Sequence, residues 1–286
     1  MSKKNLLHYY PDGDILIIVE DTMFCLHRNI MALASKFFQD MFTCASASSD
    51  DNGSNLTGLT LEGESALTFE NVLSHIYPNT YLPIDWKNVT EILRLADKYI
   101  MDSVVSAAKT FLEREFRKEP LCALYLADRY LFKDIYKEAS KLVLETFPDY
   151  KIKSTFRELS IQTRNALTNR YLEYTDALGK LNKVDFTSGY LHCTECLNSI
   201  NHNREINEKL VNKVRQIQVL PLPLPPISPS TTQKILFQSI GSTTCDNQFM
   251  IHQLSRKLQK HFGTFEPLEC KKHKKEHKFY LFIELG

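Results

Sequence analysis

Four side chains toward the C-terminal end of the sequence have types and spacings suited to binding a metal ion. Cys193 and Cys196 form a Cys-x-x-Cys pair, and Cys270 and His273 repeat the two-residue spacer. Tetrahedral zinc prefers thiolate and imidazole ligands, and such a spacer lets both members of a pair reach one ion. The long stretch 197–269 between the pairs departs from the compact spacing of a zinc finger.

Two interpretations of this Cys/His set stay open. In the first, the two pairs bind zinc, and His192, His202 and His277 are spare ligands. In the second, Cys193 and Cys196 are ordinary thiols, and His273 belongs to a solvated basic segment. The sequence therefore allows zinc as a cofactor but does not require it.

The second chemically suggestive feature is a basic cluster, Lys271 to Lys278. Such a cluster could contact phosphates or act as a nuclear import signal. Alternatively, these charged residues could limit aggregation of the apolar run Phe279 to Ile283 that follows them. The second interpretation is favoured because no second basic face accompanies the cluster.

Catalytic motifs are missing from the sequence. There is no glycine-rich phosphate loop, no nucleophile elbow and no His-Glu-x-x-His helix. Only 9 glycines occur in 286 residues, so few positions allow a backbone to approach a cofactor closely. We therefore expect a protein that is not an enzyme.

Composition and charge narrow the class of protein further. The chain is 43% hydrophobic and 24% charged, as in an ordinary globular protein, and its net charge is +1. This charge balance gives no reason to expect nucleic acid or a membrane surface as a partner. No apolar run is long enough to span a bilayer. The seven cysteines, with no secretory signal, favour a reducing compartment, either cytoplasm or nucleus.

The elements that would position functional side chains are clearest near the N-terminus. The β-branched run Ile15–Val19 predicts a strand, and Met23–Leu26 predicts a second one. Apolar residues then recur at spacings of three and four from Ile30 to Met41, as in an amphipathic helix. Ser35 divides this stretch, and its hydroxyl can cap the second helical piece.

Three blocks in this order resemble a BTB/POZ domain over about residues 9–116. The turn Val19–Thr22 looks most like the BTB proteins expanded in filamentous fungi. The positions that match the family pattern are Asp14, Phe24, His27, Arg28, Leu33, Ala34, Ser35, Phe38, Met41 and Phe42, then Phe69, Val72, Leu73, Ile76, Tyr77 and Pro78, then Leu93–Tyr99.

The resemblance implies an α+β fold, with a cluster of helices flanked by a small sheet. We expect a BTB/POZ-like domain at residues 9–118 and a helical, BACK-like extension at 119–181. A C-terminal region at 182–286 contains a proline-rich spacer at 221–229, where proline density favours an extended chain.

Several residues receive structural interpretations at this point. Spacing predicts that Phe37, Phe38, Phe42, Tyr99 and Phe111 pack in the core. Apolar surroundings predict that Cys25, Cys44 and Cys122 are buried or nearly buried. Pro148 is expected to end the helical stretch 121–147.

The resemblance also suggests an interaction groove formed by Asp14, His27 and Arg28. In related transcription-regulating domains, the matching acidic and basic residues line a charged groove at a dimer interface. The alternative is that Asp14 and Arg28 form an ion pair or a hydrogen-bonded cap that only holds the fold. His27, between a strand and a helix start, is more typical of a structural histidine.

By resemblance, the function is protein–protein interaction, as an adaptor or scaffold and as a homodimer built near strand Ile15–Val19 and helix Ile30–Phe42. A nuclear transcription regulator is the alternative from another class. A substrate adaptor of a cullin-based ubiquitin ligase is a further possibility. Thr43–Ser48 lacks the apolar-x-Glu motif of such adaptors, which puts cullin binding in doubt.

Overall fold

The computed structural model describes residues 3–46, 57–78, 82–180, 208, 212, 228–232, 266–267 and 279–286. They belong to two compact units, unit 1 (Met1–Glu115) and unit 2 (Phe116–Gly286). No helix among the described residues is both long and apolar enough to cross a bilayer. The Cys/His set, the basic cluster 271–278 and most of the spacer 221–229 lie outside the described residues.

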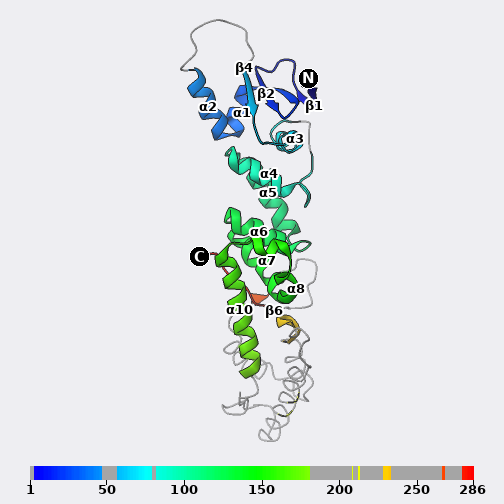
Figure 1. Ribbon diagram of the computed structural model, residues 1–286, viewed down its shortest axis with the longest axis vertical. Helices are drawn as coiled ribbons and strands as arrows, with labels where there is room; N and C mark the ends of the chain where they lie inside the picture. Colours follow the sequence, from blue (N-terminus) through cyan, green and yellow to red (C-terminus); the bar gives the residue numbers. More distant parts are fainter. Residues whose placement is uncertain are drawn as a thin grey trace, which may run out of the picture. The chain divides into compact units, whose positions relative to one another are not determined.

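Unit 1 contains a sheet with strand order β1-β3-β2-β4. The strands are β1 Lys3–Tyr9, β2 Ile15–Val19, β3 Thr22–Leu26 and β4 Thr57–Leu61. The pairs β1–β3 and β2–β4 are parallel, and β2–β3 is an antiparallel hairpin. In Figure 1, α1 and α2 lie to the left of these blue strands and α3 lies below them.

The hairpin forms where the sequence predicts it because β2 is a β-branched apolar run that fits a buried sheet. Ile17 lies opposite Phe24 of β3 and Leu59 of β4. Ile15, Ile17 and Val19, which alternate along β2, are all 1% exposed or less. Full burial of each such side chain stabilises the fold by roughly 1.5–3 kcal/mol.

Gly13 is required at its position by a close backbone approach. A Cβ atom there would lie 2.8 Å from both the Cys25 sulfur and the Leu26 carbonyl oxygen. The Asp14 N–H donates to this Leu26 oxygen at 2.9 Å. Gly13 therefore lets the chain enter β2 tightly against the end of β3.

Five helices accompany this sheet in the described part of unit 1. They are α1 Arg28–Ala34, α2 Lys36–Ser46, α3 Ala66–Leu73, α4 Val89–Lys98 and α5 Asp102–Glu115. Ser35 separates α1 from α2, as expected, and its hydroxyl oxygen accepts the N–H of Phe38 at 3.2 Å. The same hydroxyl donates to the Tyr99 carbonyl at 2.5 Å, which joins the α1–α2 junction to the end of α4.

Most of the described residues of unit 2 are helical. Its helices are α6 Pro120–Tyr130, α7 Lys133–Glu145, α8 Phe147–Lys151, α9 Ser154–Glu158 and α10 Ile161–Lys180. Two short strands, β5 Glu266–Pro267 and β6 Phe279–Tyr280, pair antiparallel. The chain breaks between α6 and α7 at Leu131, which adopts a left-handed conformation with φ 59°.

The start of α10 is tied to α6 by one carboxylate. Asp128 of α6 accepts the backbone N–H of Ser160 at 2.8 Å and the hydroxyl of Thr163 at 2.7 Å. Thr163 is in turn 2.8 Å from the Tyr136 hydroxyl on α7. Side chains from three helices thus satisfy one another in the interior of unit 2.

The structure corrects several packing expectations. Phe37 is 39% exposed and Phe42 is half-buried, whereas Phe38, Tyr99 and Phe111 are buried as predicted. Spacing alone places Phe37 on the apolar stripe, but the break at Ser35 gives α2 its own axis. A stripe drawn continuously through α1 and α2 therefore misplaces it.

The cysteine and proline expectations fail in part. Cys25 is buried as predicted, Cys122 is half-buried, and Cys44 is exposed. Pro148 lies in the first turn of α8, and α7 has already ended at Glu145. Proline suits this first turn because its missing N–H would have no helical partner there.

The predicted α+β fold class is confirmed by these elements. The division at residues 118 and 181 stays a prediction, because residues 181–207 lie outside the described residues.

Candidate functional site

The predicted groove residues lie where the β2–β3 hairpin meets α1. Asp14 Oδ1 accepts the backbone N–H of Arg28 at 2.7 Å, so this carboxylate caps the exposed start of α1. The Arg28 guanidinium lies 5.6 Å from the centre of the Phe42 ring on α2. The structure thus brings Asp14 and Arg28 together through a side-chain-to-backbone contact.

His27 is held through both its backbone N–H and its imidazole ring. Its backbone N–H donates to the Tyr77 hydroxyl at 2.9 Å, and its Nε2 lies 3.4 Å from Asp12 Oδ2. Its ring also lies 5.3 Å from the ring of Tyr10, centre to centre. These contacts are those of a histidine that anchors the start of α1 against its surroundings.

Behind His27 lies a cluster of rings that sequence reasoning did not assemble. The Tyr10 and Tyr77 rings stack at 4.7 Å, and His8 Nδ1 lies 3.2 Å from the Tyr10 hydroxyl. His8 Nε2 lies 3.3 Å from the Ser74 hydroxyl. Burial lowers the pKa of His8, and burial raises the pKa of Tyr77 to about 12, so both rings are neutral near pH 7.

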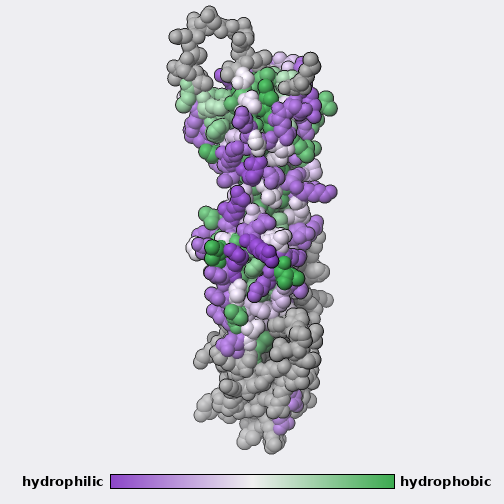
Figure 2. Space-filling view, viewed as in Figure 1, coloured by the Kyte–Doolittle hydropathy of each residue, from purple (hydrophilic) through white to green (hydrophobic). Residues whose placement is uncertain are grey.

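Three exposed apolar side chains surround the α1–α2 junction, and we call Leu33, Phe37 and Ile100 the junction patch. Leu33 is 91% exposed and Ile100 is 49% exposed. Ile100 reaches the junction because its carbonyl accepts the Lys36 N–H at 3.2 Å. Figure 2 shows hydrophobic, green atoms over the α1–α2 region of the visible face.

Strand β1 exposes a second apolar site. Leu6 is 97% exposed and Leu7 is 43% exposed on this strand. Because β1 is at one end of the sheet order, its outer edge can pair with another strand. Exposed single leucines are common on protein surfaces, so the combination with a sheet edge is what marks this one.

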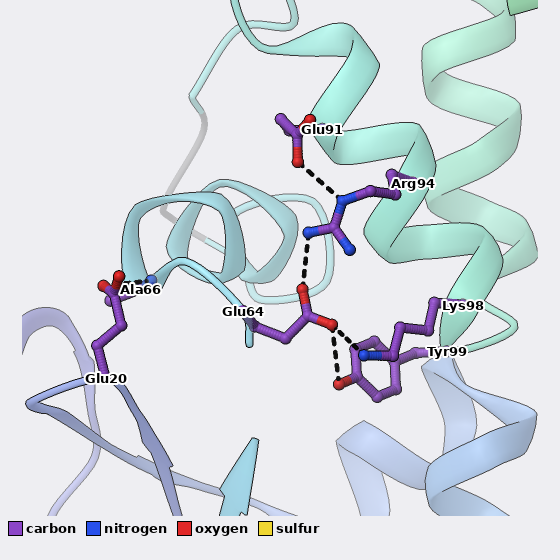
Figure 3. Close-up of polar contacts among 7 residues, drawn as sticks. All are labelled: Glu20, Glu64, Ala66, Glu91, Arg94, Lys98 and Tyr99. Atoms are coloured by element: carbon purple, nitrogen blue, oxygen red, sulfur yellow. Dashed lines mark hydrogen bonds and ion pairs between the residues drawn. The ribbon is translucent and has the colours of Figure 1, made fainter. Parts of the chain in front are cut away.

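The α1–α2 region rests on α4, which is fixed by a buried carboxylate. The Glu64 side chain is fully buried, between Arg94 Nη2 at 2.7 Å and the Lys98 ammonium group. The Tyr99 hydroxyl lies 3.4 Å from Glu64 Oε1, and Arg94 also pairs with Glu91 at 2.8 Å (Figure 3). This network ties the β4–α3 turn to α4.

The network fixes the charge of Glu64. Burial alone would raise the pKa of Glu64, but hydrogen bonds from Arg94 and Lys98 outweigh it and hold that pKa below its usual value. The same carboxylate raises the pKa of Arg94. All three groups are therefore charged across the ordinary pH range, and the cluster acts as a structural clamp.

An open cleft of about 550 Å³ runs along the β4–α3 turn, lined by residues 60–65 and Glu20. Glu20 is already engaged, since Oε2 accepts the Ala66 N–H at 3.1 Å. Within the described part of the chain, no group of three or more His, Cys, Asp or Glu side chains is arranged to hold a metal ion.

Sequence reasoning missed the Glu64 clamp, although one signal was present. Arg94 and Lys98 are four residues apart, so they share one face of α4 beside Tyr99. Two cations next to a core aromatic residue predict that a buried acidic side chain lies close to them. Nothing in the local sequence identifies that acid as Glu64, because a turn 30 residues away supplies it.

The comparisons with known proteins agree with this arrangement in unit 1. A sequence profile described as the BTB/POZ domain matches residues 6–115. BTB and MATH domain-containing protein 36 of Caenorhabditis elegans is 26% identical over 168 residues, 56% of this chain and 49% of that protein. Kelch-like protein 15 of Gallus gallus is 27% identical over 57% of this chain and 35% of that protein.

The chain therefore spans about half or less of the length of these curated relatives. Among solved structures, the BTB domain of zebrafish PATZ1 is 19% identical over 36% of this chain and 76% of that chain, with a TM-score of 0.30. From the profile match, the hairpin-first sheet and its helices, we conclude that residues 6–115 of this chain form a BTB/POZ domain.

Proposed function

We propose that this protein is a non-catalytic interaction module that self-associates through its BTB/POZ domain and acts as an adaptor or scaffold. The observation that carries the proposal is the junction patch. Leu33 is 91% exposed, whereas Met31 and Phe38 on the same two helices are fully buried. Apolar surface of this kind, held on rigid elements, favours association.

The support beneath the patch strengthens the proposal. Phe37 packs edge-on against Phe38 and Tyr99, at 5.4 and 5.2 Å between ring centres. Tyr99 in turn belongs to the Glu64 clamp. A partner would thus meet apolar side chains whose positions are already fixed, so little conformational entropy is lost on binding.

We assign Asp14, His27 and Arg28 to the border of this interface. Asp14 and Arg28 lie at the exposed start of α1, the helix that carries Leu33. The Arg28 guanidinium over Phe42 can serve both as a cation and as a flat apolar contact. Charged side chains at such a border chiefly set which partner is accepted and how fast it binds.

The deciding experiment is the solution mass of the full chain by size exclusion with light scattering, for the wild type and for Leu33→Glu. We expect a dimer for the wild type and a monomer for the variant, because the new carboxylate would lose its water in the interface. Leu67→Glu is the matched control, since Leu67 is 66% exposed on α3 and outside the patch.

A monomeric wild type, or a Leu33→Glu dimer as stable as the control, would contradict self-association through the patch. Arg28→Glu then tests the border: we expect weaker association without loss of fold. The narrower likeness to BTB proteins of filamentous fungi stays a prediction, since the relatives above are animal proteins.

A further inference from the structure

The face of α7 in unit 2 is covered by a segment that lies far away in the sequence. Tyr280, Leu281 and Ile283 are 6%, 1% and 8% exposed, respectively. Ile283 contacts Ser140 of α7 across 143 residues of chain. We call residues 280–284 the docked segment.

The contact between α7 and the docked segment has a defined polar centre. The Ile283 N–H donates to Ser140 Oγ at 3.1 Å. The Ser140 hydroxyl has one proton, and its closer acceptor is the Lys137 carbonyl at 2.7 Å rather than the Ile283 carbonyl at 3.4 Å. Ser140 therefore acts mainly as an acceptor for the peptide N–H, a contact that depends on an extended backbone rather than on side-chain identity.

Two lysines flank Ser140 on the same helical face and contact side chains of the docked segment. Lys137 Nζ lies 3.1 Å from Glu284 Oε1 and 4.4 Å from the centre of the Phe282 ring. Lys141 Nζ lies 5.9 Å from the same ring, and its ammonium group pairs with Glu138. The face thus contacts an aromatic residue and an acid two positions further on.

The chemistry of this face differs from that of a permanent core. Ser140 is fully buried and Lys141 is 2% exposed, although both are polar. Lysine is rarely buried in a protein interior, because its ammonium loses hydration. When the docked segment leaves, these groups return to water, which makes the uncovered helix far less unfavourable than an exposed apolar face would be.

We propose that the α7 face formed by Lys137, Ser140 and Lys141 is a docking site for an extended peptide of the pattern apolar-aromatic-apolar-acidic, and that residues 280–284 occupy it as a displaceable ligand built into the chain. The covering segment holds the site closed until a peptide of the same pattern replaces it. This proposal concerns unit 2 and does not depend on self-association through the BTB/POZ domain.

The test uses the full chain with Ile283→Asp as receptor, and a fluorescein-labelled peptide of residues 279–286 as probe. The introduced carboxylate cannot occupy the apolar position, so the built-in ligand is released. We expect fluorescence anisotropy to show binding to this variant, and at least roughly tenfold weaker binding to the wild type, whose tethered segment competes at a high effective concentration.

Two further variants keep the test decisive. If circular dichroism shows that Ile283→Asp is unfolded, Phe282→Ser with Glu284→Lys replaces it as the released receptor. Adding Ser140→Ala to the receptor should weaken peptide binding on the order of tenfold, because the Ile283 N–H would lose its acceptor. A peptide with the same residues in scrambled order should not bind.

Three results would overturn the proposal. They are a folded released receptor that does not bind the peptide, equal binding by the wild type, and binding that Ser140→Ala leaves unchanged. A dimer that persists with Leu33→Glu but disappears with Ile283→Asp would instead assign the α7 face to the segment of a second copy, and would overturn occupancy within one chain.

Discussion

Units 1 and 2 treat their outward-facing helices in opposite ways. In unit 1, the junction patch at α1–α2 leaves Leu33 91% exposed. In unit 2, the α7 face is covered by a segment from the far end of the sequence, with Leu281 only 1% exposed. The exposed surface is apolar, and the covered one is built around a serine and two lysines.

This difference is instructive because a large apolar side chain is exposed at one surface, while a serine and a lysine are buried at the other. An apolar patch left open on a rigid support is suited to a permanent partner, such as a second copy. A covered face that contains polar groups is better suited to exchange than a wholly apolar one, since those groups can be hydrated when the face is uncovered. The two proposals above assign stable association to the junction patch and exchangeable binding to the α7 face.

The largest effect is expected from a substitution that unfolds the sheet of unit 1 and so tests whether this sheet supports the junction patch. Ile17→Asp would place a carboxylate at a fully buried position of β2, opposite Phe24 and Leu59. We expect a loss of more than about 4 kcal/mol in the free energy of unfolding, enough to unfold the sheet. Hydrogen exchange should show lost amide protection in β2, β3 and β4.

Leu6→Asp is the control for that substitution, because Leu6 is 97% exposed on β1. Protection in the sheet should stay unchanged in this variant. A well-protected sheet in Ile17→Asp would refute the assigned core.

The next effect concerns the clamp beneath the junction patch. Glu64→Gln removes the charge that Arg94 and Lys98 share, and we expect a loss of about 2–3 kcal/mol in chemical denaturation. Part of the cost is recovered because the Lys98 side chain is 51% exposed and can be hydrated. Glu62→Gln, on the exposed part of the same turn, should change stability little.

The clamp also has a signature in pH. The pKa of folded Glu64 lies below its ordinary value of 4.5, so its contribution to stability is complete above that pH and is lost as pH falls through the folded pKa. Stability below about pH 4.5 should therefore fall less steeply in Glu64→Gln than in the wild type. Parallel curves would contradict a clamp that is charged in the folded state.

A smaller effect on stability is expected from a substitution in the interior of unit 2. The Tyr174 hydroxyl on α10 lies 2.8 Å from that of Thr232, which is 2% exposed. Tyr174→Phe should lower stability by about 1 kcal/mol, since the Thr232 hydroxyl loses a partner. Tyr125→Phe, whose hydroxyl accepts a bond from Arg129 at an exposed site, is the control and should be nearly neutral.

The smallest effect concerns His8. Burial lowers the pKa of His8 below 6.5, so folding favours the neutral ring and stability decreases as pH falls below that value. Replacing His8 with Gln should reduce this decrease between pH 7 and pH 5 in thermal unfolding. Part of the decrease should remain, because burial also lowers the pKa of His75. An unchanged slope would show that His8 does not titrate with folding.

The sequence predicted the hairpin, the break at Ser35 and most helices because these depend on local patterns. Ile15–Val19 is a mostly β-branched apolar run, and Ser35 interrupts the helical spacing that follows it. The predicted burial of Phe37 and Cys44 was wrong for a related reason. Periodicity assigns a residue to a face of its helix, but it does not say whether another element covers that face.

The features of the candidate site also divide into those set by local sequence and those set by tertiary contacts. The sequence by itself placed Asp14 at the start of a strand, and His27 and Arg28 between a strand end and a helix start, because these residues and elements are neighbours along the chain. Only the tertiary structure decided that Glu64 clamps α4, that His8 and Tyr77 share a cluster, and that residues 280–284 cover α7. Each of these contacts joins positions 30 to 143 residues apart. Local propensity does not predict contacts between residues so far apart in the sequence. The partner of each residue is instead determined by the match of shape, charge and hydrogen bonding in the folded chain.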